Sequence, residues 1–206
     1  IIEKVNFKGY KKVTYTEAEE IGRARSMVQI FSQYPVILAA SVMAISWLGM
    51  TVVMQVTPLF MNYEGYDVPI IARAVMIHSL GMFAFSSGTG WLTSRIGRLP
   101  VVALGIVLLI VSGISGCFAD TLITLYIAVF LLGVGWNFLF ISGTSLLVIS
   151  YKPEEKFKAQ GLNDFLVFTT QATGALAAGY LLYLTNWKFI NILCIPLLLV
   201  VLIVIL

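Results

Sequence analysis

Two apolar runs of the chain are joined by the sequence Gly90-Trp91-Leu92-Thr93-Ser94-Arg95-Ile96-Gly97-Arg98-Leu99. This sequence carries two arginines and no acidic residue. The runs beside it, at about 70–93 and 100–118, contain a single charged residue, Arg73. A bilayer core about 30 Å thick is crossed by roughly 20 apolar residues in a helix. We therefore predict that the quoted sequence is a short turn between two membrane-spanning helices.

Four further runs have the same apolar character, at about 35–60, 121–149, 160–184 and 188–206. Of the 206 residues, 59% are hydrophobic and 11% are charged, whereas a soluble domain carries about 25% charged residues. Too little polar surface is present to cover a water-soluble fold. We predict an all-α membrane protein in which residues 35–206 form a bundle of six transmembrane helices.

Lysine and arginine residues are distributed unevenly between the two sets of loops. Eleven of the 13 lie in residues 1–34 and in the loops after the second and fourth spans. The loops on the other side contain only Lys188, at the edge of the sixth span. Cytoplasmic loops carry the excess of basic residues. The chain is therefore predicted to be a multi-pass protein of the plasma (inner) membrane with both of its ends in the cytoplasm.

Residues 1–34 differ in composition from the rest and are predicted to form a cytoplasmic linker. Thr16 and Glu19 have the spacing of a capping box. The apolar residues that then recur on one helical face are Ile21, Ala24, Val28 and Phe31. This pattern indicates an amphipathic helix lying on the inner membrane surface, and a plain solvated linker is the alternative.

Both ends of the chain have unusual compositions. The first residue is Ile1, and residues 201–206 are uniformly apolar, whereas membrane helices usually end with a polar flank. We expect the chain to be part of a longer one, and a natural half-size protein is the alternative.

The quoted turn resembles the cytoplasmic signature loop of the major facilitator superfamily, whose pattern is roughly Gly-x-Leu-x-Asp-Arg-x-Gly-Arg-Lys/Arg. The matching positions are Gly90, Leu92, Arg95, Gly97 and Arg98. Ser94 stands where the family prefers Asp, and Leu99 stands where it prefers a basic residue. Gly97 can adopt backbone angles that are closed to other residues. Arg95 and Arg98 can bind acidic groups or helix C-termini, so we predict that this loop belongs to a gate.

The resemblance covers residues from about 17 to 206 and implies one half of a 12-helix transporter. Members of this family have two six-helix halves related by an axis along the membrane normal. The loop is degraded here, and Val129 stands where a first half would carry an Arg ahead of Gly133. We interpret the chain as the second half of a secondary active transporter that moves a small solute by alternating access. The missing N-terminal six-helix half is then an expected partner, together with the lipid bilayer.

Polar side chains within the bilayer usually face a protein interior or a wet cavity. They are concentrated in spans one, two, four and five, which in the resembled family line the central cavity. The predicted cavity residues are Trp47, Thr51, Gln55, His78, Trp136, Asn137, Phe168 and Gln171. For each of them, a role in holding helices together is the alternative. This neutral and aromatic set favours an uncharged or amphipathic solute.

Two titratable residues of the spans attract functional hypotheses. His78 has the intrinsic chemistry to carry a coupling proton, and a hydrogen-bonded packing role is the alternative. Asp164 lies in the first turn of the fifth span, where a carboxylate complements the helix dipole. We predict that it pairs with Arg95 or Arg98 as a latch of the cytoplasmic gate.

Small residues recur at helical spacing in the third and fifth spans and are predicted to allow helices to approach closely. In the third span they are Gly105, Gly113 and Gly116. In the fifth they are the pairs Gly174 with Ala178 and Ala175 with Gly179.

Other classes of function have little support in the sequence. One histidine, no cysteine pair and no serine near a base argue against an enzyme, a metal or a cofactor. The sequence contains no basic stripe interleaved with aromatic residues, so it gives no support for nucleic-acid binding. The sequence also contains no ring of charged residues and no filter-like loop, so it gives no support for a channel. A non-transporting sensor or scaffold on the same fold remains an alternative, and the direction of transport, uptake or efflux, is left open.

Overall fold

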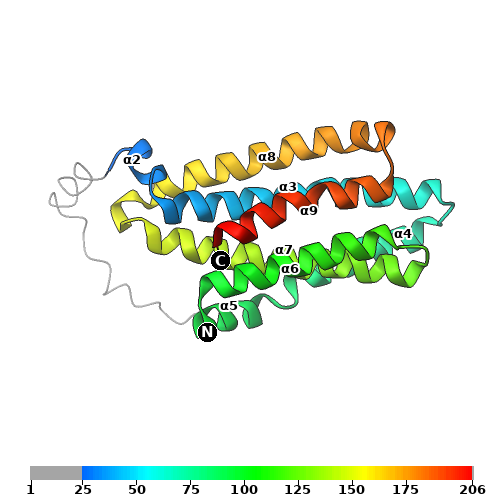
Figure 1. The fold of residues 1–206 in the computed structure, drawn as a ribbon, viewed down its shortest axis with the longest axis horizontal. Helices are drawn as coiled ribbons and strands as arrows, with labels where there is room; N and C mark the ends of the chain where they lie inside the picture. The colour runs from blue at the N-terminus through cyan, green and yellow to red at the C-terminus, as the bar shows by residue number, and fades with distance from the viewer. Residues whose placement is uncertain (1–24, 206) are drawn as a thin grey trace, which may run out of the picture.

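The computed structural model describes residues 25–205, which form a bundle of long helices (Figure 1). The segments are α2 (Met27–Phe31), α3 (Tyr34–Tyr63), α4 (Val68–Phe83), α5 (Ser86–Ile96), α6 (Arg98–Cys117), α7 (Leu122–Ser150), the 3-10 helix η1 (Pro153–Glu155), α8 (Lys156–Leu184) and α9 (Trp187–Ile205). No strand occurs within the described residues.

Five helical segments of the described chain are long and apolar enough to cross a membrane, judged by length and composition. They are Tyr34–Tyr63, Val68–Ile96, Arg98–Cys117, Leu122–Ser150 and Pro153–Leu184. The sixth apolar helix, α9, is shorter. The prediction of an all-α membrane protein is therefore confirmed.

The helices begin at residues that favour helix starts. Pro35 and Pro69 lie in the first turns of α3 and α4, where proline already has the helical φ and its missing N–H has no partner to lose. Thr121 caps α7 by accepting a hydrogen bond from the backbone N–H of Thr124 at 3.2 Å. These residues fix the positions at which the helices begin.

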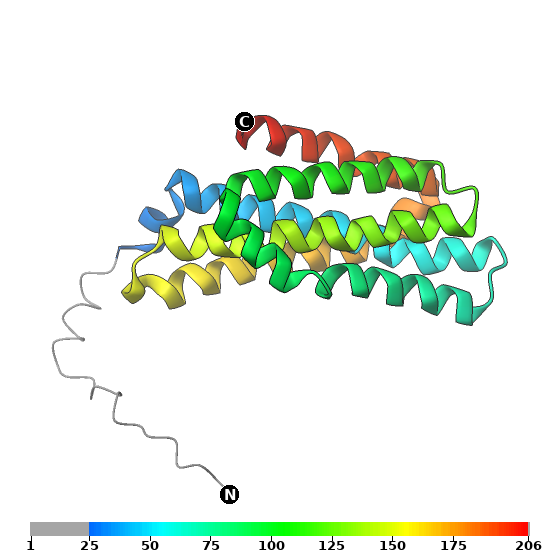
Figure 2. The same ribbon diagram turned by 90° about the horizontal axis from the view of Figure 1, so that it is seen from below.

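Helices α3 and α7 form the centre of the bundle. Helix α7 packs against α3, α4, α5 and α6, whereas α3 also packs against α8 and α9. Figure 2 shows α6 and α9 along one side of the bundle and α4 along the opposite side, with α5 running obliquely from α4 to α6. Helix α8 lies at one edge in Figure 1 and makes most of its contacts with α3. We call the side of α3 and α7 that is turned away from α6 and α9 the open face.

Glycines allow α7 to approach both α4 and α6 closely. A Cβ atom added at Gly81 would lie 2.6 Å from the carbonyl oxygen of Phe130. A Cβ atom added at Gly105 would lie 3.1 Å from the carbonyl oxygen of Gly135. Backbone therefore packs on backbone at both contacts, as small residues permit in membrane helices. The predicted packing role of Gly105 is confirmed.

The small residues of α8 behave differently from one another. Ala178 is buried, and a Cβ atom at Gly174 would lie 2.9 Å from Cδ1 of Leu48 on α3. A Cβ atom at Gly179 would meet no atom within 4 Å. The prediction that Ala175 and Gly179 form a second packing pair is therefore wrong at Gly179, because Gly179 borders a cavity and does not contact another helix closely.

The second predicted span is two helices instead of one. Helix α4 ends at Phe83, α5 begins at Ser86, and Phe85 has φ −97° and ψ 1° between them. Helices kink where glycine and serine cluster, and Ser87 and Gly88 follow the break directly. The apolar composition continues through the break, so hydropathy alone does not locate it.

The described part of the N-terminal segment forms the short helix α2. Ser26 accepts a hydrogen bond from the backbone N–H of Gln29 at 3.3 Å, and the Gln29 side chain accepts one in return from the Ser26 N–H at 2.9 Å. Ile30 is buried, whereas Val28 is exposed. The predicted cap at Thr16 and Glu19, and the predicted apolar positions Ile21 and Ala24, lie outside the described residues.

An ion pair joins this segment to the loop between α7 and α8. The Arg25 guanidinium donates two hydrogen bonds of 2.6 Å to the Glu155 carboxylate, whose side chain is fully buried. Backbone N–H groups of Arg25 and Lys152 donate to the same carboxylate at 3.1 and 2.9 Å. The hydrogen bond to Glu155 raises the pKa of Arg25 above its usual range, so the pair is held charged. We call this end of the bundle, which also carries Arg95 and Arg98, the basic end.

Substitution of Gly133 by alanine is expected to lower the stability of the protein. The new Cβ would contact the His78 carbonyl oxygen and lie 2.9 Å from the backbone nitrogen of Met82. Overpacking of this kind costs about 1–3 kcal/mol. The thermal unfolding midpoint of the purified intact protein in detergent checks this expectation. Gly88→Ala is the matched control because a Cβ at Gly88 meets nothing within 4 Å. Equal midpoints for the two variants would contradict the packing described for α4 and α7.

Substitution of Glu155 by glutamine is expected to lower the same midpoint. The change removes the charge that pairs with Arg25, and a hydrogen bond to a charged group contributes about 1.5–3 kcal/mol. Glu154→Gln serves as the control, because no ion pair of Glu154 occurs in the described structure. In an Arg25→Gln background, Glu155→Gln should have a much smaller effect. Additive effects of the two substitutions would show that the pair does not contribute as a unit.

Candidate functional site

Four aromatic side chains meet where α3, α4 and α7 face one another. The ring of Trp47 on α3 stands perpendicular to that of Trp136 on α7, with centroids 5.0 Å apart. Phe140 stacks on Trp136 with centroids 4.8 Å apart and an interplanar angle of 8°. Phe83, the last residue of α4, meets Trp136 edge to face at 6.4 Å. We call these four residues the aromatic cluster.

Polar atoms at this cluster lack hydrogen-bond partners. Within the described residues, the indole nitrogens of Trp47 and Trp136 are buried and unpaired, and so is the hydroxyl oxygen of Thr51. Buried polar groups are nearly always paired in native proteins, because an unmet donor costs about 1–3 kcal/mol. The two indoles thus combine flat apolar surface with unused N–H donors, which suits an aromatic ligand that carries hydrogen-bond acceptors.

The cluster belongs to the open face of the bundle. Trp47, Thr51 and Gln55 follow one another at steps of four residues and therefore share one side of α3. Trp47 is half-buried, and Gln55 is exposed. The structure thus brings the predicted cavity residues Trp47 and Trp136 into contact, and Thr51 lies one turn further along the same side of α3.

The predicted cavity residues of α8 stay apart from the cluster. Asp164, Phe168 and Gln171 share one side of α8, with Phe168 exposed and Gln171 half-buried. Within the described residues, no ring contact joins Phe168 to the aromatic cluster. Their role in the site remains a prediction.

Asn137 lies next to Trp136 but points to a different helix. Its amide nitrogen donates to the Met82 carbonyl oxygen at 2.7 Å and to the Ser86 hydroxyl at 2.9 Å. Its side-chain oxygen accepts a hydrogen bond from Thr89 at 2.6 Å. Met82 and Ser86 lie on either side of the break between α4 and α5, so Asn137 holds both pieces of the second span against α7. Of the two roles considered for Asn137, this conformation shows the packing role, because every group of the amide is used inside the protein.

The polar contacts continue along α5 toward the basic end. The hydroxyl groups of Thr93 and Ser142 lie 3.1 Å apart, and both side chains are buried. Beyond them, Nε of Arg98 donates to the Ser145 hydroxyl at 3.0 Å. Together with Asn137, these residues form a polar seam that joins α7 to α4, α5 and the start of α6.

His78 is buried between α4 and α7. Its Nδ1 lies 3.0 Å from the Val129 carbonyl oxygen. Since a carbonyl oxygen only accepts, Nδ1 carries the proton. Nε2 is buried without a partner in the described structure, so it presents an unused lone pair. His78 therefore has a packing contact on one nitrogen and a free acceptor on the other.

The prediction that Gly90–Leu99 is a short turn is wrong for most of its length, because residues 90–96 belong to α5 and Arg98 and Leu99 begin α6. Only Gly97 lies between the two helices. Gly97 has φ +94°, a conformation that favours glycine. Gly90 is exposed and Leu92 is half-buried on the preceding helix. The Arg95 guanidinium lies over the Trp91 ring, 5.1 Å from its centroid.

The latch predicted at Asp164 is not formed in this conformation. Asp164 is exposed, and its carboxylate accepts a hydrogen bond of 3.4 Å from Asn163. In the described part of the chain, the ion pair at the basic end is Arg25 with Glu155. The latch with Arg95 or Arg98 stays a prediction.

A cavity of about 1050 Å³ opens at the end of the bundle opposite the basic end. Phe60 and Trp187 stack in its wall with centroids 4.6 Å apart, and Glu64 and Asp120 contribute carboxylates. None of the predicted site residues lines it.

Sequence reasoning missed several residues of this site. Phe140 could have been found, because it follows Trp136 by four residues and thus shares its side of α7. Thr89 and Thr93 carry the same spacing on α5. Phe83 and Glu155 had no such signal, since their partners lie far away in the sequence.

Comparison with known families places the chain. The family model described as the Major Facilitator Superfamily matches residues 39–206. The chain belongs to the major facilitator superfamily. It is thus an integral membrane protein of a family of transporters, and the resemblance inferred from the signature loop is confirmed.

Curated relatives agree with this family. The chain is 36% identical over 179 residues to the riboflavin transporter RfnT of Brucella anthropi, a match that covers 87% of the chain and 45% of the relative. It is 34% identical over 146 residues to the uncharacterized MFS-type transporter YdeG of Bacillus subtilis, covering 70% of the chain and 34% of the relative. A second Bacillus subtilis relative, the uncharacterized MFS-type transporter YddS, is 30% identical over 159 residues, covering 76% and 36%. The chain spans less than half the length of these relatives.

Replacement of Asn137 by alanine is expected to lower the thermal unfolding midpoint of the intact protein. The change removes the amide that bonds to the Met82 carbonyl oxygen and to the Ser86 and Thr89 hydroxyl groups. Thr89 keeps its bond to the Phe85 carbonyl oxygen, and each buried group left unmet costs about 1–3 kcal/mol. Asn62→Ala, at an exposed helix end, is the matched control. An Asn137→Ala protein of unchanged stability that has lost its activity would instead assign Asn137 to the ligand site.

Proposed function

We propose that this chain is the second six-helix half of a major facilitator transporter whose intact form carries a small uncharged aromatic solute across the plasma membrane by alternating access. The observation that carries this proposal is the aromatic cluster with its two buried, unpaired indole N–H groups. Both ends of the chain are proposed to be cytoplasmic, because the basic residues gather at that end of the bundle.

Exposed apolar side chains beside the open face support the proposal of a partner half. Large apolar side chains on its flanking helices are exposed, including Met76 and Phe83 on α4 and Phe168 on α8. Within the bundle, α4 packs chiefly on α7 and α8 chiefly on α3. A second six-helix half across this face would cover these side chains and would enclose the aromatic cluster near the middle of the membrane, where substrates bind in this fold.

The chemistry of the cluster favours an uncharged aromatic solute. No charged side chain belongs to it, and a charge in this environment would be costly without a partner. Stacked and perpendicular indoles offer surface for a flat ring. The indole nitrogens of Trp47 and Trp136 are buried in this conformation, so these side chains must move before their N–H groups can donate to carbonyl or ring-nitrogen acceptors of the solute.

Riboflavin is the first solute to test. Its ring system is flat and carries carbonyl and ring-nitrogen acceptors, which match the two indole donors. The relative from Brucella anthropi is named as a riboflavin transporter, and the match to it includes most of this chain.

His78 is the proposed site for a coupling proton. It is buried, and its Nε2 has an unused lone pair between α4 and α7. A proton taken up there would place a charge beside the helix that carries Trp136, which is the type of coupling that histidine supports in transporters.

The transport proposal is tested by uptake of radiolabelled riboflavin into proteoliposomes that contain the intact protein. Trp136→Phe keeps a ring but removes the indole N–H, and a lost neutral hydrogen bond of about 0.5–1.5 kcal/mol predicts an increase in KM of roughly 2- to 12-fold. Trp91→Phe is the control, because Trp91 is exposed and phenylalanine keeps a ring beneath Arg95.

The outcomes distinguish a wrong choice of solute from a wrong proposal of transport. Uptake of a different uncharged aromatic solute with the same dependence on Trp136 would replace riboflavin but keep the site. Unchanged KM values in Trp136→Phe would remove the aromatic cluster from the site. The absence of uptake across a broad panel of solutes would favour the alternative of a sensor or scaffold on this fold.

A further inference from the structure

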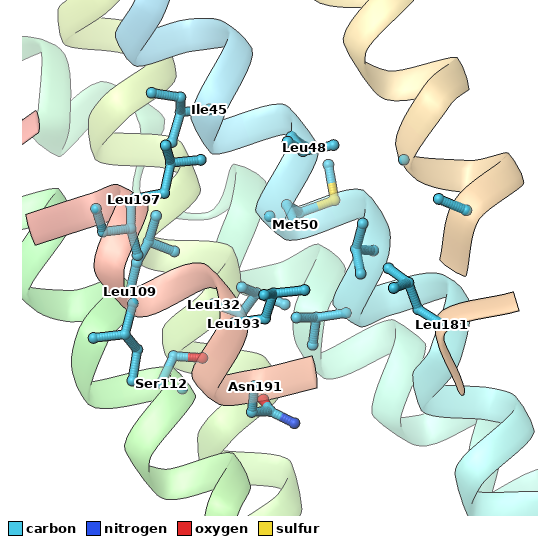
Figure 3. A pocket seen from close by; sticks show the side chains of 18 of the residues that line it. Ile45, Leu48, Met50, Leu109, Ser112, Leu132, Leu181, Asn191, Leu193 and Leu197 are labelled. Atoms are coloured by element: carbon cyan, nitrogen blue, oxygen red, sulfur yellow. The ribbon is translucent and has the colours of Figure 1, made fainter. Parts of the chain in front are cut away.

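A cavity of about 310 Å³ lies inside the bundle on the far side of α3 from the aromatic cluster (Figure 3). Five helices contribute to its wall, namely α3, α6, α7, α8 and α9. Side chains that Figure 3 shows around it are Ile45, Leu48, Leu109, Leu132, Leu181 and Leu197. Ile45, Leu48 and Val52 follow one another at steps of three and four, so they share a side of α3 that does not include Trp47 or Thr51. The cavity is therefore separate from the proposed substrate site.

Each polar side chain in the wall of this cavity already donates a hydrogen bond within the protein. The Ser112 hydroxyl donates to the Ala128 carbonyl oxygen at 2.7 Å, and the Thr173 hydroxyl donates to Thr169 at 2.8 Å. The Asn191 amide donates to the Trp187 carbonyl oxygen at 2.9 Å. No charged residue lines the cavity. A polar solute would find no countercharge and, among these groups, only the second N–H of the Asn191 amide, so the cavity suits an apolar occupant.

The wall of the cavity is weakest between α8 and α9. These helices are consecutive in the chain but make few contacts with each other, and α8 is attached to the bundle through α3. The wall that α8 contributes includes the small residues Gly174 and Ala177. Figure 1 shows α8 at the edge of the bundle. A slender chain from the bilayer can therefore reach the cavity between the two helices.

The depth of the cavity selects the occupant. Its residues on α3, Ile45 to Val53, lie at the middle of a helix that runs from Tyr34 to Tyr63. The hydrocarbon core of the bilayer surrounds that depth. Hydrocarbon tails are the apolar molecules present there at the highest concentration, and an interior surface gains dispersion contacts when such a tail fills it.

We propose that this cavity binds an acyl chain of a membrane phospholipid, which enters between α8 and α9. The head group stays at the membrane surface, and the tail contacts Leu48, Leu109 and Leu197. The site requires only that the helices cross a membrane, so it is independent of which solute the protein carries.

The test uses the intact protein in lipid nanodiscs that contain a trace of phosphatidylethanolamine with a diazirine near the middle of one acyl chain. After illumination, mass spectrometry locates the labelled residues. We expect label on the cavity wall at Ile45–Val53 of α3 and at Leu109–Gly113 of α6. Leu104 and Val107, which are exposed on the outer side of α6, report general contact with lipid.

Two variants of α8 make the result specific. Ala177→Phe places a ring in the cavity wall and should reduce label there at least fivefold, with label at Leu104 and Val107 unchanged. Ala172→Phe adds the same ring at an exposed position of α8 that does not line the cavity and should leave all label unchanged. Leu48→Phe fills the cavity from α3 and provides a second variant should Ala177→Phe fail to fold.

Two results would overturn the proposal. One is label at the cavity wall that is equal in the wild type, Ala177→Phe and Leu48→Phe. The other is a wild-type protein labelled at Leu104 and Val107 but not at the cavity wall, which would show that lipid does not enter or that a protein segment covers the opening.

Discussion

The contacts of α7 with its neighbours are the constraint on which the rest of this structure depends. Lipid tails are as apolar as leucine, so no hydrophobic force drives helices together inside a membrane. Association must come from close packing and from hydrogen bonds between helices. Gly133 and Gly135 lie on different sides of α7, and each lets the backbone of another helix approach. Helix α7 can therefore contact α4 and α6 at once and still present Trp136 to α3.

One turn of α7 carries both a residue of the aromatic cluster and the residue that holds the broken second span. Trp136 and Asn137 are consecutive, so their side chains point about 100° apart around the helix. Trp136 takes part in the aromatic cluster, whereas Asn137 holds the broken second span through Met82 and Ser86. The broken second span and the aromatic cluster are therefore both in contact with this one turn of α7. Discontinuous helices near a binding site are common in transporters.

The sequence was sufficient for the features that depend on composition and failed where contacts between distant residues decide. Apolar runs predict the membrane helices because lipid requires them. The polar residues of the spans were placed on the correct helices, yet their partners were not predicted. Asn137 could not be assigned to packing without knowing that the chain breaks at Phe85, and Glu155 could not be assigned without knowing that Arg25 reaches it. The glycines show the same limit, since Gly105 and Gly179 both lie within apolar runs, but of the two only Gly105 closely meets another helix.

The bond between Arg25 and Glu155 also has a consequence for the biosynthesis of the protein. The two residues are 130 positions apart, and four membrane spans are synthesised between them. The ribosome therefore delivers the arginine long before its partner, and the bond can close only after α7 has been inserted. Until then the arginine remains a cation at the membrane surface. Closure of the bond then joins the first and fourth spans of the bundle, so the order of synthesis makes it a late step of assembly.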